Sequence, residues 1–152
     1  MAHAHVVYDN DTRFIIDPVT RNIRNTSGKA VIVQYDHNSE RFTFEIPKNV
    51  DGHDMSTCNR VEIHFNNKGT GAEANGVYRI EDNMIDTSNA NAVICTWLIS
   101  SEATQYAGPL RFSVRYMCVT ENDGKETVDY AWSTATYSEI TIMSGIYNGT
   151  EV

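Results

Sequence analysis

The 152-residue chain contains only two leucines, Leu98 and Leu110, against 13 isoleucines and 13 valines. Leucine is a common filler of helical cores, whereas β-branched side chains fit the pleated surface of a sheet. No apolar run approaches the roughly 18 residues of a membrane-spanning helix. No charged segment followed by an apolar one marks a secretory signal at the N-terminus. We therefore expect one all-β domain with no signal peptide and no membrane partner.

Basic residues and cysteines are also scarce. Twelve Lys and Arg against 20 Asp and Glu give a net charge of −8, which argues against a nucleic-acid partner because such proteins need a basic face. The three cysteines, Cys58, Cys95 and Cys118, are odd in number and form no C-x-x-C pair. The sequence thus predicts free, mostly buried thiols, no disulfide and no metal site.

Three runs alternate between apolar and polar residues, as half-buried strands do. They are 42–46, 61–65 and 110–118. The alternation, together with two tryptophans in apolar surroundings, predicts a core that contains Phe42, Phe44, Ile63, Phe65, Trp97, Phe112, Val114 and Trp132.

Turn residues separate these short strands, and this spacing predicts an immunoglobulin-like antiparallel β-sandwich with one short helix, Ser100–Tyr106. The polar link 36–39 predicts a hairpin between the runs 30–35 and 41–46. Asn122-Asp123-Gly124 predicts a second hairpin. The expected organisation is a flexible N-terminal arm over residues 1–12, the sandwich over 13–144 and a C-terminal tail over 145–152.

Few residues suggest chemistry. Gly69-Thr70-Gly71 resembles the start of a dinucleotide-binding loop, but no helix pattern follows it, so a strand connection is the better interpretation. Loops could bring His37 near Asp51, His53 and Asp54, and such a cluster could bind a metal ion. No spacing demands it, and solvated loop residues are the favoured interpretation. The sequence offers no nucleophile elbow, no H-E-x-x-H pair and no identifiable carboxylate pair. We therefore predict no catalytic, cofactor-binding or metal-binding residue, and no cofactor.

Several local strings are more distinctive than any of these motifs. They are Val7–Asp9, Phe14–Arg21, Val33–Phe44, Asp51–Met55, Cys58–Glu62, Thr96–Ser100 and Ala103–Tyr106. Through them the chain resembles, to about Ser144, the N-terminal domain of tail and baseplate proteins encoded by phages and prophages of gut Firmicutes. Its role would be similar to that of baseplate upper proteins, whose N-terminal domain docks on the tail. No catalytic or binding residue is attached to these strings.

The resemblance implies a non-enzymatic virion structural protein, made in the bacterial cytoplasm, that binds other tail or baseplate proteins and can form a homo-oligomer. The chain has no coiled coil and no receptor-binding head after the domain, so it is expected to be either a short paralogue or an excised domain. Two other functions stay open. A carbohydrate-binding β-sandwich would need exposed aromatic residues in a row or a calcium loop. A hydrolase would need an acid pair borne on loops.

Overall fold

Almost all regular structure is β-strand in the computed structural model, which describes residues 11–28 and 31–146. Within these residues, helical structure is limited to three 3₁₀ turns: η1 (Met55–Thr57), η2 (Asp82–Met84) and η3 (Ser101–Ala103). The all-β prediction is therefore confirmed. The predicted N-terminal arm and C-terminal tail fall mostly outside the described residues, and those domain boundaries stay predictions.

The first sheet has the strand order β2-β1-β4-β10-β9. Its strands are β2 (Ile23–Asn25), β1 (Thr12–Ile16), β4 (Arg41–Pro47), β10 (Ala92–Leu98) and β9 (Ile85–Asp86). β4 and β10 pair antiparallel along their whole length and form the middle of the sheet. Thr43, a polar residue of the alternating run 42–46, is nevertheless buried, and its hydroxyl lies 3.4 Å from that of Thr96 on β10.

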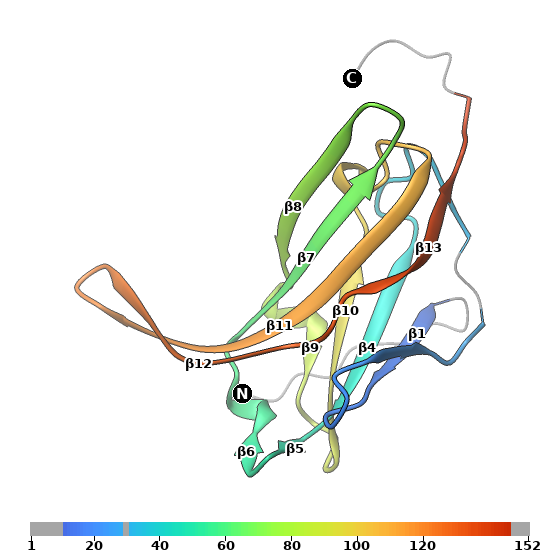
Figure 1. Cartoon of the computed structure of the whole chain (residues 1–152). Helices are drawn as coiled ribbons and strands as arrows, with labels where there is room; N and C mark the ends of the chain where they lie inside the picture. The colour runs from blue at the N-terminus through green and yellow to red at the C-terminus, as the bar shows by residue number, and fades with distance from the viewer. Residues whose placement is uncertain (1–10, 29–30, 147–152) are drawn as a thin grey trace.

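The second sheet has the order β3-β13-β11-β7-β8, and β12 pairs with the far end of β11. Its strands are β3 (Ile32–Val33), β13 (Tyr137–Met143), β11 (Gly108–Asn122), β7 (Arg60–Lys68), β8 (Glu73–Arg79) and β12 (Lys125–Ser133). A separate short pair consists of β5 (Asn49–Val50) and β6 (His53–Asp54). Figure 1 shows the long β11–β12 hairpin bending away from the two sheets.

The five-stranded and six-stranded sheets pack face to face around one core, as in a β-sandwich. The sheets are mixed, however, where the sequence predicted antiparallel ones. β1 pairs parallel to β4, and β13 pairs parallel to β3. The β1–β4 pair is not a hairpin: after β2 the chain adds β3 to the other sheet and then returns as β4 beside β1.

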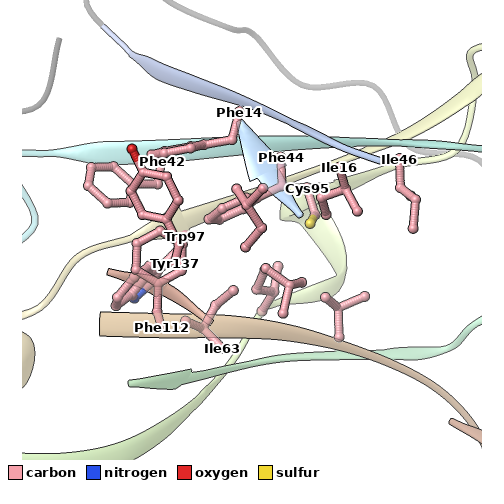
Figure 2. Close-up of a cluster of buried hydrophobic side chains, with 14 of the residues drawn as sticks. Phe14, Ile16, Phe42, Phe44, Ile46, Ile63, Cys95, Trp97, Phe112 and Tyr137 are labelled. Carbon is pink, nitrogen blue, oxygen red and sulfur yellow. The ribbon is translucent and has the colours of Figure 1, made fainter. Parts of the chain in front are cut away.

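An aromatic cluster between the sheets forms the core (Figure 2). Phe112, from β11 in the second sheet, lies at its centre, with ring-centroid distances of 5.3 to 5.7 Å to five other aromatic rings. These rings belong to Phe14, Phe42, Phe44, Trp97 and Tyr137. All eight residues predicted for the core are buried, so the predicted inward faces of these strands are confirmed.

The helix predicted for residues 100–106 is reduced to the single 3₁₀ turn η3. The Ala103 and Thr104 amides donate to carbonyls three residues earlier, which is the 3₁₀ pattern. Thr104 then leaves the turn. Its hydroxyl donates to the Asp36 carbonyl at 2.7 Å, and its carbonyl accepts from the Tyr35 amide at 3.0 Å. These tertiary hydrogen bonds replace those of a longer helix.

The predicted hairpin between residues 30–35 and 41–46 is wrong, because β3 and β4 lie in different sheets. Tyr35, just before the link, and Asn38 within it have positive φ angles of 75° and 58°. Their amides bond to the carbonyls of Thr104 and Ile99 instead of to a neighbouring strand. The link therefore crosses from one sheet to the other.

Candidate functional site

The outer part of the β11–β12 hairpin, residues 119–129, extends beyond both sheets, and we call it the projecting hairpin (Figure 1). Residues 120–129 are all exposed although their strands are paired in register. The predicted turn is confirmed. Asp123 and Gly124 have φ angles of 53° and 78°, as a type I′ hairpin turn requires. The projecting hairpin is therefore regular structure that makes little contact with the core.

Specific contacts hold the base of the projecting hairpin. The pairing of β11 with β7 ends at Met117 and Arg60, and a bulge follows between Cys118 and Val119. The side chain of Asn59 continues the ladder: it donates to the Val119 carbonyl and accepts from the Val119 amide, both at 2.8 Å. Arg60 makes two hydrogen bonds to the Glu126 carboxylate, at 2.9 and 2.6 Å. These bonds fix the direction in which the hairpin leaves the sandwich.

The projecting hairpin is acidic. Four carboxylates stand against the single cation Lys125, for a net charge of −3. They belong to Glu121, Asp123, Glu126 and Asp129. Hydrogen bonds from Arg60 lower the pKa of Glu126, so this carboxylate is ionised at neutral pH. Val128, about half exposed, is the large apolar side chain of this surface.

A second feature, the His–Cys cluster, lies at the base of the same hairpin and consists of His53, Cys58 and Cys118. His53 Nε2 lies 3.6 Å from Cys118 Sγ and 3.9 Å from Cys58 Sγ. The two sulfur atoms are 3.8 Å apart, and all three cysteines of the chain are free. Cys58 is buried, and the other two members of the cluster are partly buried.

Three separate segments position the cluster. Asp51 and Gly52, with φ angles of 51° and 83°, form the tight turn that joins β5 to β6 and places His53. Cys58 ends the 3₁₀ turn η1, and Cys118 precedes the bulge in β11. The His53 ring stacks on Tyr130 of β12, with centroids 3.6 Å apart and an interplanar angle of 8°.

The polar groups around the cluster are held by the same turn. Thr57 Oγ1 donates to the Asp54 carbonyl at 2.6 Å and lies 3.3 Å from His53 Nε2 and 3.7 Å from Cys118 Sγ. The Asp54 carboxylate caps η1, and hydrogen bonds from Ser56 lower its pKa. Burial, reinforced by Cys118, raises the pKa of the Cys58 thiol to about 12. In the metal-free protein the Cys58 thiol is therefore protonated at neutral pH.

The loop cluster of His37, Asp51, His53 and Asp54 that the sequence left open does not form in the structure. His37 precedes β4, whereas Asp51, His53 and Asp54 follow it, so the seven-residue strand separates them. His37 Nδ1 accepts from the Ser101 amide at 2.9 Å. Asp51 lies in the β5–β6 turn, and Asp54 caps η1. Of these four residues, His53 alone belongs to the His–Cys cluster. The Gly69–Gly71 segment connects β7 and β8, as predicted.

Cys58 and Cys118 are the cluster residues that the sequence did not indicate. They are 60 positions apart, and no standard ligand spacing links either of them to His53. The available signal was weak: Asp51-Gly52 marks a hairpin turn just before His53, and Cys118 ends the alternation of its strand. The local sequence pattern does not show which strand packs against this loop, because that contact joins distant parts of the chain.

A sugar-binding platform of exposed aromatic rings is absent from the described residues. Trp97 and Trp132 are buried, and Tyr35 is the one aromatic side chain among the exposed large hydrophobic residues of that part of the chain. A groove of about 610 Å³ lies along β7, β8 and β11. His64, Asn66, Asn75 and Arg111 contribute polar groups to it, and Phe65 and Phe112 lie beneath. No described helix is long and apolar enough to span a bilayer.

No protein-family model matches the chain, and no curated protein sequence matches it. Among solved structures, the chain is similar to the N-terminal domain of phage TP901-1 ORF48, with 13% sequence identity and a TM-score of 0.49. The similarity covers 88% of this chain and 97% of the phage domain.

Proposed function

We propose that this chain is a non-enzymatic structural protein of a phage tail or baseplate, which acts in the virion as an assembly and attachment module. The observation that carries the proposal is the projecting hairpin, a regular element, exposed over residues 120–129, that the sandwich itself does not need for its core. The sequence resemblance to tail and baseplate domains gives the class of partner.

The projecting hairpin has the properties of a preformed contact element. Its turn, the Asn59 bonds and the Arg60–Glu126 pair hold it in one conformation, so docking costs less conformational entropy than docking of a disordered segment. Within residues 11–28 and 31–146, no strand pairs with the outer edge of β12, so a partner strand can add there. Four carboxylates favour a partner with a basic surface.

Attachment through so small an element is weak for one copy. Linked copies around a tail raise the effective concentration of each contact without adding a new one. We therefore propose that the protein works in several copies in the particle, as a homo-oligomer or a ring, whatever its state when free.

Co-purification with the tail proteins encoded beside this chain tests the proposal. The test variant lacks Thr120, Glu121, Glu126 and Thr127, so that Val119 and Val128 join the unchanged turn 122–125. Removing two residues from each strand keeps every side chain on its original face. We expect the wild-type chain to co-elute with a tail partner and the shortened variant to lose this binding while keeping its β-sheet circular dichroism.

A matched control carries Glu139→Lys on β13, and its counterpart carries Glu121→Lys on the projecting hairpin. Both reverse one exposed carboxylate, and only Glu121→Lys should weaken binding. Equal binding by the shortened and wild-type chains would refute the role of the hairpin. Saturable binding to defined glycans with no tail partner would favour the carbohydrate-binding alternative, and substrate turnover would overturn the non-enzymatic assignment.

A further inference from the structure

We propose that His53, Cys58 and Cys118 form a binding site for one thiophilic divalent cation of the Zn²⁺ class, which fastens the base of the projecting hairpin to the β5–β6 loop. The proposal rests on this cluster alone and does not depend on what the hairpin binds.

The separations among the three ligand atoms fit a tetrahedral ion. With Zn–S bonds of about 2.3 Å and Zn–N bonds of about 2.0–2.1 Å, tetrahedral angles put two sulfurs about 3.8 Å apart and a nitrogen about 3.6 Å from each sulfur. The observed sulfur–sulfur distance is 3.8 Å, and the two nitrogen–sulfur distances are 3.6 and 3.9 Å. One ion can therefore contact all three atoms with only small side-chain adjustments.

The kinds of ligand and their setting also suit such an ion. Two thiolates and one imidazole are soft or borderline donors, which select Zn²⁺ or Cu(I) over Mg²⁺ or Ca²⁺. Stacking on Tyr130 holds the plane of the His53 ring, and Nε2 is the nitrogen that faces both sulfurs. Thr57 and Cys58 also line part of a groove of about 380 Å³.

Thr57 marks the fourth coordination position. Its Oγ1 lies 3.3 Å from His53 Nε2 and 3.7 Å from Cys118 Sγ, on the same scale as the other ligand separations. The hydroxyl hydrogen is used by the Asp54 carbonyl, so an oxygen lone pair remains to bind the ion or to accept from a water bound to it. The protein thus supplies three strong ligands and a polar fourth side.

Cobalt(II) titration of the reduced full chain tests this site, because tetrahedral Co²⁺ with thiolate ligands gives intense visible bands and a sulfur-to-metal charge-transfer band. The background variant carries His3→Ala and His5→Ala, so that the terminal histidines cannot bind metal. We expect one Co²⁺ per chain with a tetrahedral spectrum, its displacement by Zn²⁺, and a higher Tm with Zn²⁺ than with a chelator.

Cys58→Ser, Cys118→Ser and His53→Gln should each weaken Zn²⁺ binding by about 100-fold or more, since even outer-shell substitutions at metal sites cost about 10–100-fold. Cys95→Ala and His64→Gln are matched controls outside the cluster and should bind as the background does. Circular dichroism checks the fold of each variant, and the spectrum of the background chain tests the proposal without any of them.

Three results would overturn the proposal. The first is an octahedral or absent Co²⁺ spectrum in the reduced background chain. The second is equal Zn²⁺ affinity in the background and in Cys58→Ser and Cys118→Ser. The third is a Cys58–Cys118 disulfide as the state of freshly purified protein, with no metal bound. In that last case a disulfide between Cys58 and Cys118, and not a metal ion, would link η1 to β11.

Discussion

Phe44→Ala perturbs the centre of the core, and its cost follows from the geometry. The Phe44 side chain is 0% exposed, and its ring centroid lies 5.1 Å from that of Phe14 and 5.6 Å from that of Phe112. Those two rings come from different sheets, so neither can collapse into the cavity without moving its own strand. Core Phe→Ala substitutions cost about 3–5 kcal/mol. For a domain of this size that loss lowers Tm by about 6–20 °C.

Urea unfolding followed by tryptophan fluorescence measures this change, because Trp97 and Trp132 are both buried in the native state. The control is Glu45→Ala, one position along β4 on the exposed face, which should change stability by less than about 0.5 kcal/mol. A loss below about 1 kcal/mol for Phe44→Ala would refute the packing. A larger cost for Glu45→Ala than for Phe44→Ala would show that the strand register is wrong, since a slip of one residue exchanges the two faces.

Three further predictions follow from single contacts. Gly76→Ala should lower the free energy of unfolding by about 1–3 kcal/mol in urea, because the new Cβ would lie 2.4 Å from Phe65 Cζ; an unchanged midpoint would contradict this close approach. Arg60 lowers the pKa of Glu126 below its usual 4.5, so the ion pair stabilises the fold above pH 4.5 and this contribution is lost as the pH falls through the lowered pKa. The difference in unfolding free energy between wild type and Glu126→Gln should therefore shrink as the pH falls below 4.5. A difference that does not change with pH would be the contrary result. Alkylation of the unreduced, denatured protein with a chelator present should modify all three cysteines in the mass spectrum, and a Cys58–Cys118 crosslink is the contrary outcome.

The parts of the fold that the sequence predicts are those with a strong local signal. Strict alternation places Phe112 and Val114 inward, because a two-residue period leaves no other face for them once one side is buried. Asp123-Gly124 predicts its turn because few other pairs accept positive φ at both central positions.

The parts that the sequence misses depend on distant partners. Residues 100–106 carry acceptable helix signals, yet a hydrogen bond from the Tyr35 amide to the Thr104 carbonyl and one from the Thr104 hydroxyl to the Asp36 carbonyl end the turn early. Likewise, the polar link 36–39 resembles a hairpin loop, although its backbone bonds to another segment and crosses between sheets. Local pattern measures neither of these tertiary contacts.

The His–Cys cluster and the projecting hairpin are one mechanical unit, because they share the pair Cys118 and Tyr130. These two residues face each other across the β11–β12 ladder at the base of the hairpin. Cys118 contributes a sulfur to the cluster, and Tyr130 stacks on the cluster's imidazole. Any swing of the hairpin against the sandwich must therefore change contacts on both sides of His53. Cys58 belongs to the buried core, and Cys118 and Tyr130 pack against it, so this base is joined to the sandwich as well as to the hairpin. An ion at the cluster would thus fix the direction of the contact element and, because it binds the folded chain, would also raise the stability of the protein.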